Sequence, residues 1–190
     1  MPAPLTEADY QAAATSLACD VPAIKAVAEV ESAGSGFNPD GTVKVLFEGH
    51  VFYRETSGRF KAERPDLCFK TWTKAHYSKS QEGEHKRLSD AERLDRKAAL
   101  RATSFGRFQI MGFNHKAAGY DTVEAFVADM RISEAKHLAA FVSFLKYNDL
   151  DIPLRMHDWP AFAKGYNGSA YALNRYDVKM AQAWKKHGGA

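Results

Sequence analysis

The spacing of apolar residues changes only once along the chain, and this constrains the fold more than any other feature. Through most of the 190 residues, apolar positions recur every three or four residues, as they do on the buried face of a helix. After a turn predicted at residues 38–41, Val43, Val45 and Phe47 instead occupy every second position, which is typical of a short strand. The sequence therefore predicts a mainly α chain with one small β hairpin.

Capping residues predict where several helices begin. Thr6 with Asp9 forms a capping box that starts a helix to about residue 18, and Ser89 with Glu92 forms a second one, which predicts a helix to about residue 103. The polar stretch 58–88 has weak periodicity and predicts a long loop. Further helices are predicted over residues 50–56, 121–130, 133–148, 158–167 and 173–186.

The composition excludes several classes of protein. The net charge is only +3 and the basic residues are spread along the chain, with no RNA-binding motif or zinc-finger spacing, so no nucleic-acid partner is indicated. Cys19 and Cys68 are too few for a disulfide framework and are predicted to be reduced and structural. The seven histidines contain no close ligand pair, so no metal or cofactor is predicted. His50, His115 and His137 are predicted to be surface or capping residues.

The sequence also predicts a protein without stable membrane insertion. No apolar run approaches the length that crosses a bilayer. The first ten residues, MPAPLTEADY, lack the basic start and apolar core of a signal peptide, which predicts synthesis in the cytoplasm. We expect a monomer.

Glu31 is the most unusual residue of the predicted helix over residues 21–31, whose N-cap is Asp20. It falls within the apolar stripe of this helix, whereas Glu29 points away from the stripe. Burial and the negative end of the helix dipole would both raise the pKa of such a carboxyl group. A protonated carboxylic acid near neutral pH is what general acid catalysis requires. On position alone, a glutamate that caps a neighbouring loop through a buried hydrogen bond is an equal alternative.

Two later segments contain the residue types of a sugar-binding groove. SFGRFQIMG at 104–112 and GYNG at 165–168 each combine glycine with an amide and aromatic rings. Gln109 and Asn167 can bond to hydroxyl and acetamido groups, and Tyr166 can stack on a pyranose ring. The alternative for the apolar members, Phe108, Ile110 and Met111, is a place in the core.

The order of these motifs resembles the lysozyme-like superfamily, including goose-type lysozymes and soluble lytic transglycosylases. VESAGSGF, VLFEGHVFYR, SFGRFQIMGFNH and FAKGYNG together resemble the N-acetylmuramidase family of phage endolysins, from about residue 20 to residue 187. The resemblance implies a lysozyme-like α+β fold with a substrate groove. It also implies cleavage of the β-1,4 bond between N-acetylmuramic acid and N-acetylglucosamine in peptidoglycan. On this basis Glu31 and Glu48 are the catalytic carboxylates, and Ser32, Gln109, Tyr166 and Asn167 bind the substrate.

Further expectations follow from the resemblance. Residues 1–190 would form a single catalytic domain without a separate cell-wall-binding domain, made without a signal peptide and acting on the cell wall after release. Phe105 and Arg107 stand where the family commonly has Trp and Leu, which predicts a more basic groove wall. Similarity to goose-type enzymes favours inversion, with Glu48 orienting or activating water.

Several alternatives remain open from the sequence. Glu48 can also be read as a solvated glutamate at the end of a strand. A lytic transglycosylase would form anhydro-muramic acid ends instead of hydrolysing the bond. A metal-dependent amidase or peptidase and a non-catalytic glycan-binding module are the other rivals.

Overall fold

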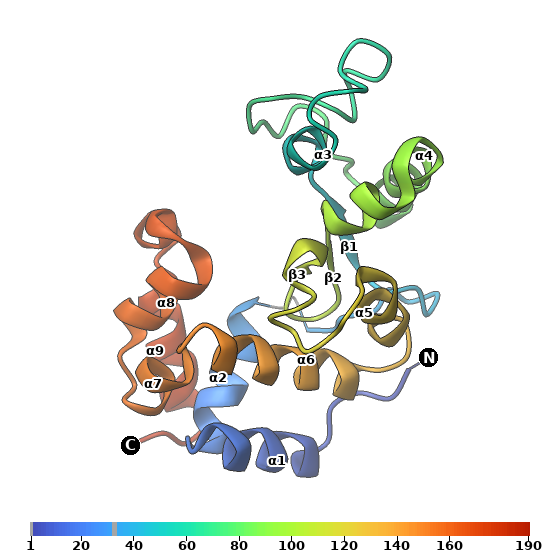
Figure 1. Cartoon of the computed structure of the whole chain (residues 1–190). Coiled ribbons are helices and arrows are strands. Elements are labelled where there is room, and N and C mark those ends of the chain that lie inside the picture. The colour runs from blue at the N-terminus through green and yellow to red at the C-terminus, as the bar shows by residue number, and fades with distance from the viewer. Residues whose placement is uncertain (1, 32–33) are drawn as a thin grey trace.

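The computed structural model of the chain describes residues 2–31 and 34–190, with the side chains of residues 169 and 170 outside this description. Helices dominate, and a small sheet lies between two groups of them (Figure 1). One group holds α1 and α2 with the helices of the C-terminal third, and the other holds α3 and α4 with the long loop between them. The predicted mainly α, α+β fold is confirmed.

The first two helices begin where their capping residues predict. α1 (Glu7–Leu17) carries the complete capping box of Thr6 and Asp9. α2 (Val21–Glu31) begins after Asp20, whose Oδ1 accepts a hydrogen bond from the Ala23 N–H at 2.8 Å. α2 packs against α1 and α9 (Tyr176–Lys186). This packing buries the apolar stripe that leads to Glu31.

The sheet has three antiparallel strands in the order β1-β2-β3. β1 (Val45–Phe47) pairs with β2 (Thr103–Phe105), and β2 pairs with β3 (Ile110–Met111). The second motif, SFGRFQIMG, is therefore a β hairpin. Its turn contains Gly106 and Gln109 at φ +72° and +48°, a left-handed conformation that is unusual for glutamine.

Helix α4 (Gln81–Arg101) begins eight residues before the predicted position at Ser89. Its N-cap is Ser80, whose Oγ accepts from the Gly83 N–H at 3.1 Å. Ser89 and Glu92 lie inside this helix, so the prediction of a capping box there was wrong. A kink at Asp95 (φ −156°, ψ 97°) divides the helix, and the Asp95 carboxylate accepts from the Ala98 N–H and so caps the second part. α3 (Gly49–Glu55) matches its prediction.

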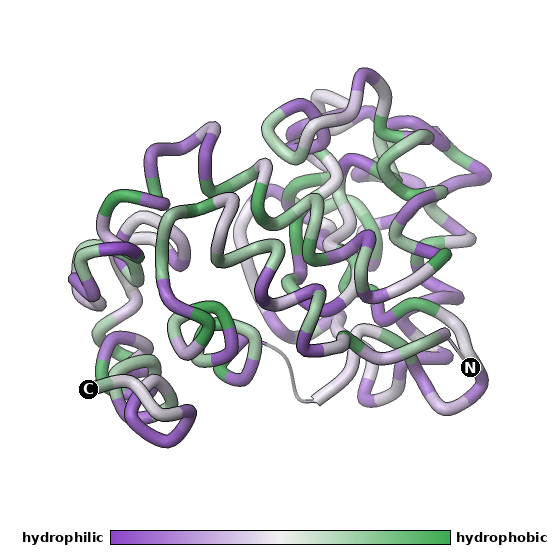
Figure 2. The backbone as a smooth tube through the Cα atoms, turned by 90° about the horizontal axis from the view of Figure 1, so that it is seen from below, coloured by the Kyte–Doolittle hydropathy of each residue, from purple (hydrophilic) through white to green (hydrophobic). Residues whose placement is uncertain are grey.

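The remaining helices complete the core. They are η1 (Gly112–Asn114), α5 (Val123–Met130), α6 (Glu134–Tyr147), α7 (Asp151–Arg155), α8 (Trp159–Asn167) and η2 (Ser169–Asn174). The predicted helix from residue 173 is wrong at its start, because η2 continues to Asn174 and Arg175 turns the chain at φ +52° before α9. Polar and apolar residues alternate along the helices, as expected for helices with one buried face (Figure 2). In the described part of the chain, no helix combines the length and apolarity needed to cross a membrane.

Candidate active site

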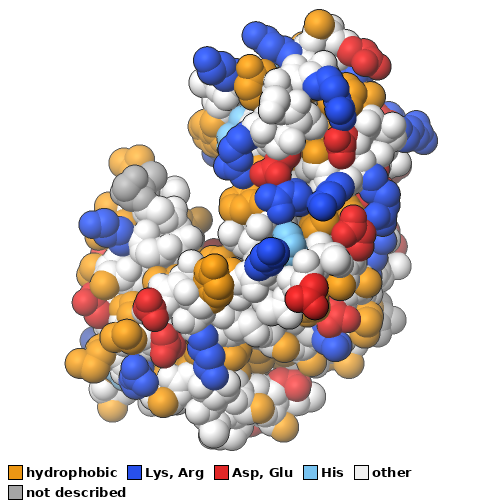
Figure 3. All heavy atoms as spheres, in the orientation of Figure 1, with side chains coloured by type: hydrophobic (Ala, Val, Ile, Leu, Met, Phe, Trp, Pro, Cys, Tyr) orange, Lys and Arg blue, Asp and Glu red, His pale blue; other side chains and the backbone are white. Residues whose placement is uncertain are grey.

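A deep notch opens in one face of the molecule, between helices α7–α9 and the part that holds the sheet with α3 and α4 (Figure 3). Glu31 is the last residue of α2 and contacts α8. Glu48 lies between β1 and α3. The two predicted catalytic carboxylates therefore come from elements on the two sides of the notch.

Glu31 is half-buried and has one hydrogen-bond partner among the described residues. Its Oε1 accepts a hydrogen bond from Asn167 Nδ2 at 3.0 Å. Burial raises the pKa of Glu31 above its ordinary value, and the bond from Asn167 offsets this only in part. Burial and the charge of Glu31 both raise the pKa values of Tyr166 and Tyr176, which places these two phenols in its surroundings. The site thus favours a protonated carboxyl group.

Asn167 is the last residue of α8 and is followed by Gly168 at φ +79°. Its Nδ2 is committed to Glu31, whereas its Oδ1 is buried and has no hydrogen-bond partner among the described residues. A buried acceptor without a donor is costly. A donor on a ligand could satisfy it.

The Glu48 side chain is mostly buried and its carboxylate accepts a hydrogen bond from another residue. Its side chain is only 15% exposed, so it is not the solvated strand-end glutamate that periodicity alone allowed. Tyr77 Oη donates to its Oε2 at 2.5 Å, and His50 Nδ1 lies 3.2 Å from the same oxygen. Although Glu48 is the N-cap residue of α3, its carboxylate makes no capping bond. It is therefore free to take part in other contacts.

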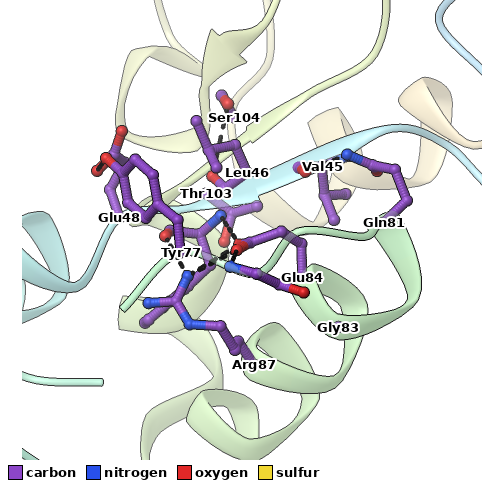
Figure 4. A network of polar contacts seen from close by, with 12 residues as sticks. Val45, Leu46, Glu48, Tyr77, Gln81, Gly83, Glu84, Arg87, Thr103 and Ser104 are labelled. Carbon is purple, nitrogen blue, oxygen red and sulfur yellow. Dashed lines mark hydrogen bonds and ion pairs between the residues drawn. The ribbon is translucent and has the colours of Figure 1, made fainter. Parts of the chain in front are cut away.

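A buried ion pair supports the backbone next to Glu48 (Figure 4). The carboxylate of Glu84 accepts from the Phe47 N–H at 3.1 Å and from the Ser78 N–H at 2.6 Å. Arg87 pairs with Glu84 at 2.9 Å and also donates to the Phe47 carbonyl oxygen at 3.2 Å. This pair joins β1, the long loop and α4. The sequence does not predict this pair, because the weak periodicity of residues 58–88 predicts a loop, although the three-residue spacing of the two charges is a helical signal.

Gln109 has both ends of its amide engaged within the hairpin. Its Oε1 accepts from Ser104 Oγ at 2.8 Å, and its Nε2 donates to the Gly106 carbonyl oxygen at 2.8 Å. These bonds hold the left-handed turn. Ser32, which was also predicted to bind substrate, lies outside the described residues, and the role of Gln109 toward a sugar stays a prediction.

Tyr166 is packed among aromatic side chains. Its ring contacts those of Phe141, Phe144 and Phe162, with centroid separations of 5.7, 5.8 and 5.8 Å. Its hydroxyl donates to the Phe108 carbonyl oxygen at 2.8 Å. These contacts join α6 and α8 to the hairpin. Stacking of Tyr166 on a sugar stays a prediction.

Arg107 is paired within the fold, and its contribution to a more basic groove wall stays a prediction. Its side chain is 12% exposed, and its guanidinium pairs with the buried Glu134 at 2.7 Å and donates to the Gly34 carbonyl oxygen at 3.0 Å. Glu134 also accepts from Ser35 Oγ and the Gly36 N–H at 2.9 and 2.6 Å. Burial alone would raise the pKa of Glu134, but these partners together lower it. The chain just after the Glu31 region is thus tied to the hairpin and α6.

His137 is buried, so its prediction as a surface histidine was wrong, whereas the alternative of a capping residue fits its contact with the last residue of α5. Its Nε2 lies 2.7 Å from the Met130 carbonyl oxygen, and its Nδ1 lies 3.1 Å from the Arg107 backbone N–H. A neutral imidazole protonated on Nε2 satisfies both contacts. Burial lowers the pKa of His137 and favours that neutral form. A side chain at Gly36 would meet the His137 ring at 2.4 Å, so only glycine fits there.

Comparisons with known proteins identify the class of fold and site. A family model described as N-acetylmuramidase matches residues 20–188. The crystal structure of Burkholderia AP3 phage endolysin superposes with a TM-score of 0.91 at 43% sequence identity, over 98% of this chain and 73% of that one. No protein of curated function matches.

The protein is a lysozyme-like glycoside hydrolase, as the resemblance of the sequence motifs predicted. Its substrate is peptidoglycan. Within that class, the chain belongs to the N-acetylmuramidase family, whose model matches it over most of its length.

Proposed function

We propose that the protein cleaves the β-1,4 bond between N-acetylmuramic acid and N-acetylglucosamine, with Glu31 as the general acid. The observation that carries the proposal is the half-buried carboxyl group of Glu31 at the end of α2, whose pKa is raised by burial. Because such a group keeps its proton to higher pH than an exposed glutamate, it can deliver that proton to the glycosidic oxygen as the bond breaks.

Glu48 is proposed to act on the water molecule that attacks the sugar. Tyr77 occupies its Oε2, and its Oε1 has no hydrogen-bond partner among the described residues, which leaves this oxygen available to a water molecule. Ionised Glu48 would accept a proton from that water as it attacks the anomeric carbon. This pairing of one acid and one base corresponds to inversion of configuration.

Asn167 is proposed to recognise the N-acetyl group. Its Oδ1, which has no hydrogen-bond partner among the described residues, can accept from an acetamido N–H next to the bond that Glu31 protonates. Similarity to the AP3 phage endolysin supports a biological role as an endolysin of a phage or prophage, acting on the bacterial cell wall.

The test is a comparison of Glu31→Gln with Glu29→Gln on purified peptidoglycan. Glutamine at position 31 removes the transferable proton, so we expect lysis to fall by roughly 10²- to 10⁴-fold. Glu29 is an exposed residue of the same helix that pairs with Lys186 and His187, so its variant is the matched control and should retain activity. If Glu31→Gln keeps more than about a tenth of the lytic rate with an unchanged circular dichroism spectrum, the assignment fails.

Mass spectrometry of the released fragments tests the reaction itself. Hydrolysis at the proposed bond leaves reducing N-acetylmuramic acid ends. Anhydro-muramic acid ends would instead show transglycosylation, and reducing N-acetylglucosamine ends would show cleavage of the other glycosidic bond.

A further inference from the structure

We propose that Trp72 is a sugar-stacking residue at the rim of the cleft and that Tyr77 links it to Glu48 as a positioning residue. The ligand would be an N-acetylated pyranose ring of the glycan strand. The proposal deepens the proposed function and rests on it, because it gives the long loop between α3 and α4 a role in the same reaction.

A directed chain of hydrogen bonds joins the three side chains. Trp72 Nε1 donates to Tyr77 Oη at 3.1 Å, and Tyr77 Oη donates to Glu48 Oε2 at 2.5 Å. The indole N–H can only donate and an ionised carboxylate can only accept, so the direction of the chain is fixed. Each bond polarises the next, so losing the indole N–H weakens the bond to Glu48.

The buried ion pair of Glu84 and Arg87 supports the position of Tyr77. The Arg87 guanidinium lies 5.8 Å from the centre of the Tyr77 ring, and Glu84 accepts from the N–H of the next residue, Ser78. Burial and the charge of Glu48 raise the pKa of Tyr77, so its hydroxyl stays a donor over the working pH range. The hydroxyl thus fixes the orientation of one carboxylate oxygen and leaves the other for water.

Trp72 is placed to meet a ligand. Its side chain is 54% exposed, whereas Trp159 is 7% exposed. The loop that carries Trp72 extends over α3 on the side of the notch (Figures 1 and 3). A ring that is this exposed and is joined by hydrogen bonds to a proposed catalytic carboxylate is poorly explained by packing. The Lys74 ammonium group lies over the ring, 5.9 Å from its centre. An indole face with a polar edge suits a pyranose ring.

Three variants separate stacking from positioning. Trp72→Ala removes both the ring and its N–H, so we expect KM to rise roughly 3- to 10-fold and kcat to fall as it does in Trp72→Phe. Trp72→Phe keeps a stacking face but removes the N–H, so KM should stay near wild type while kcat falls roughly 2- to 10-fold. Tyr77→Phe removes the bond to the carboxylate, so kcat should fall roughly 10- to 100-fold with little change in KM. Tyr147→Ala, at an aromatic residue that is 70% exposed on α6, is the matched control and should change neither constant.

Fluorescence provides a readout that does not depend on turnover. Glycan strands freed of peptide, added to the Glu31→Gln protein, should change the tryptophan emission through contact with Trp72. The same titration with Glu31→Gln/Trp72→Phe should lose most of this change. An equal change in both proteins, or a drop in melting temperature with unchanged kcat and KM in the Trp72 and Tyr77 variants, would overturn the proposal.

The Glu31→Gln variant also distinguishes the two levels of inference. If it stays active, the proposed function itself fails. If it is inactive but the Trp72 and Tyr77 variants cleave peptidoglycan like wild type, only the roles proposed for Trp72 and Tyr77 fail.

Discussion

At the scale of a single residue, Asn167 is proposed both to contact the general acid Glu31 and to recognise the N-acetyl group of the substrate. Its Nδ2 contacts Glu31 at 3.0 Å, while its buried Oδ1 has no partner among the described residues. If the residue served only to end α8, its amide would not need to reach a half-buried carboxyl group. Gly168, with φ +79°, already makes the backbone turn after the helix.

We therefore expect Asn167→Ala to lower kcat/KM by about 5- to 150-fold, which corresponds to the loss of about 1–3 kcal/mol from a buried polar contact. Because the Asn167 bond lowers the pKa of Glu31, its removal should raise that pKa further and move the alkaline limb of the rate profile to higher pH. Asn148→Ala is the matched control, since Asn148 donates to the Phe144 carbonyl oxygen at the exposed end of α6. Early melting with a wild-type rate and pH profile would return Asn167 to a purely structural role.

At the scale of elements, the ion pair of Arg107 and Glu134 holds the segment after α2 against the hairpin and α6. We expect Glu134→Gln to destabilise the fold by about 3–5 kcal/mol at pH 7, because it leaves the Arg107 guanidinium buried without its counter-charge. Glu124→Gln should have little effect, since its 3.8 Å contact with Arg96 is exposed. Thermal unfolding measures both changes.

The pH dependence of this ion pair has a definite sign. The folded protein lowers the pKa of Glu134 below the ordinary value of about 4.5 for a glutamate. The pair therefore stabilises the fold above about pH 4.5, and this contribution is lost as the pH falls through the lowered folded pKa. The gap in melting temperature between wild type and Glu134→Gln should accordingly narrow below pH 4.5. A constant gap would contradict this assignment.

Elements defined by an apolar stripe or by a local cap could be predicted from the sequence, and elements held by polar contacts between distant segments could not. The stripe of α2 and the caps at Thr6 and Asp20 are local signals, and the structure confirms them. α4 begins near Glu84 and Arg87, two charges that are buried only because β1 comes to meet them. Because this pairing joins segments that are far apart in the chain, it produces no periodic pattern of apolar residues from which the start of α4 could be predicted. For the same reason Glu31 could be found as a candidate from its position in a stripe, whereas Tyr77 and Trp72 could not.

At the scale of the whole molecule, the protein keeps a carboxyl group where its charged form is unfavourable, and this should lower its stability. The folded pKa of Glu31 lies above the ordinary value of about 4.5 for a glutamate, so the folded state binds this proton more tightly than the unfolded chain does. The cost is absent at pH values where both states are protonated. It grows as the pH rises from about 4.5 through the raised folded pKa and is then fully present.

Glu31→Gln removes that cost along with the acid, so it should raise the melting temperature at pH 7 while it abolishes lysis. The difference from wild type should disappear near pH 4, where Glu31 is protonated in the wild-type protein as well. Glu29→Gln should not reproduce the gain, because the bond from Lys186, together with His187, lowers the pKa of Glu29 and makes its charge favourable in the fold. Melting curves of the three proteins between pH 4 and pH 8 measure the effect. A Glu31→Gln variant that melts at or below the wild-type temperature at every pH would mean that the carboxylate at the end of α2 is stabilised by its surroundings, contrary to what a general acid requires.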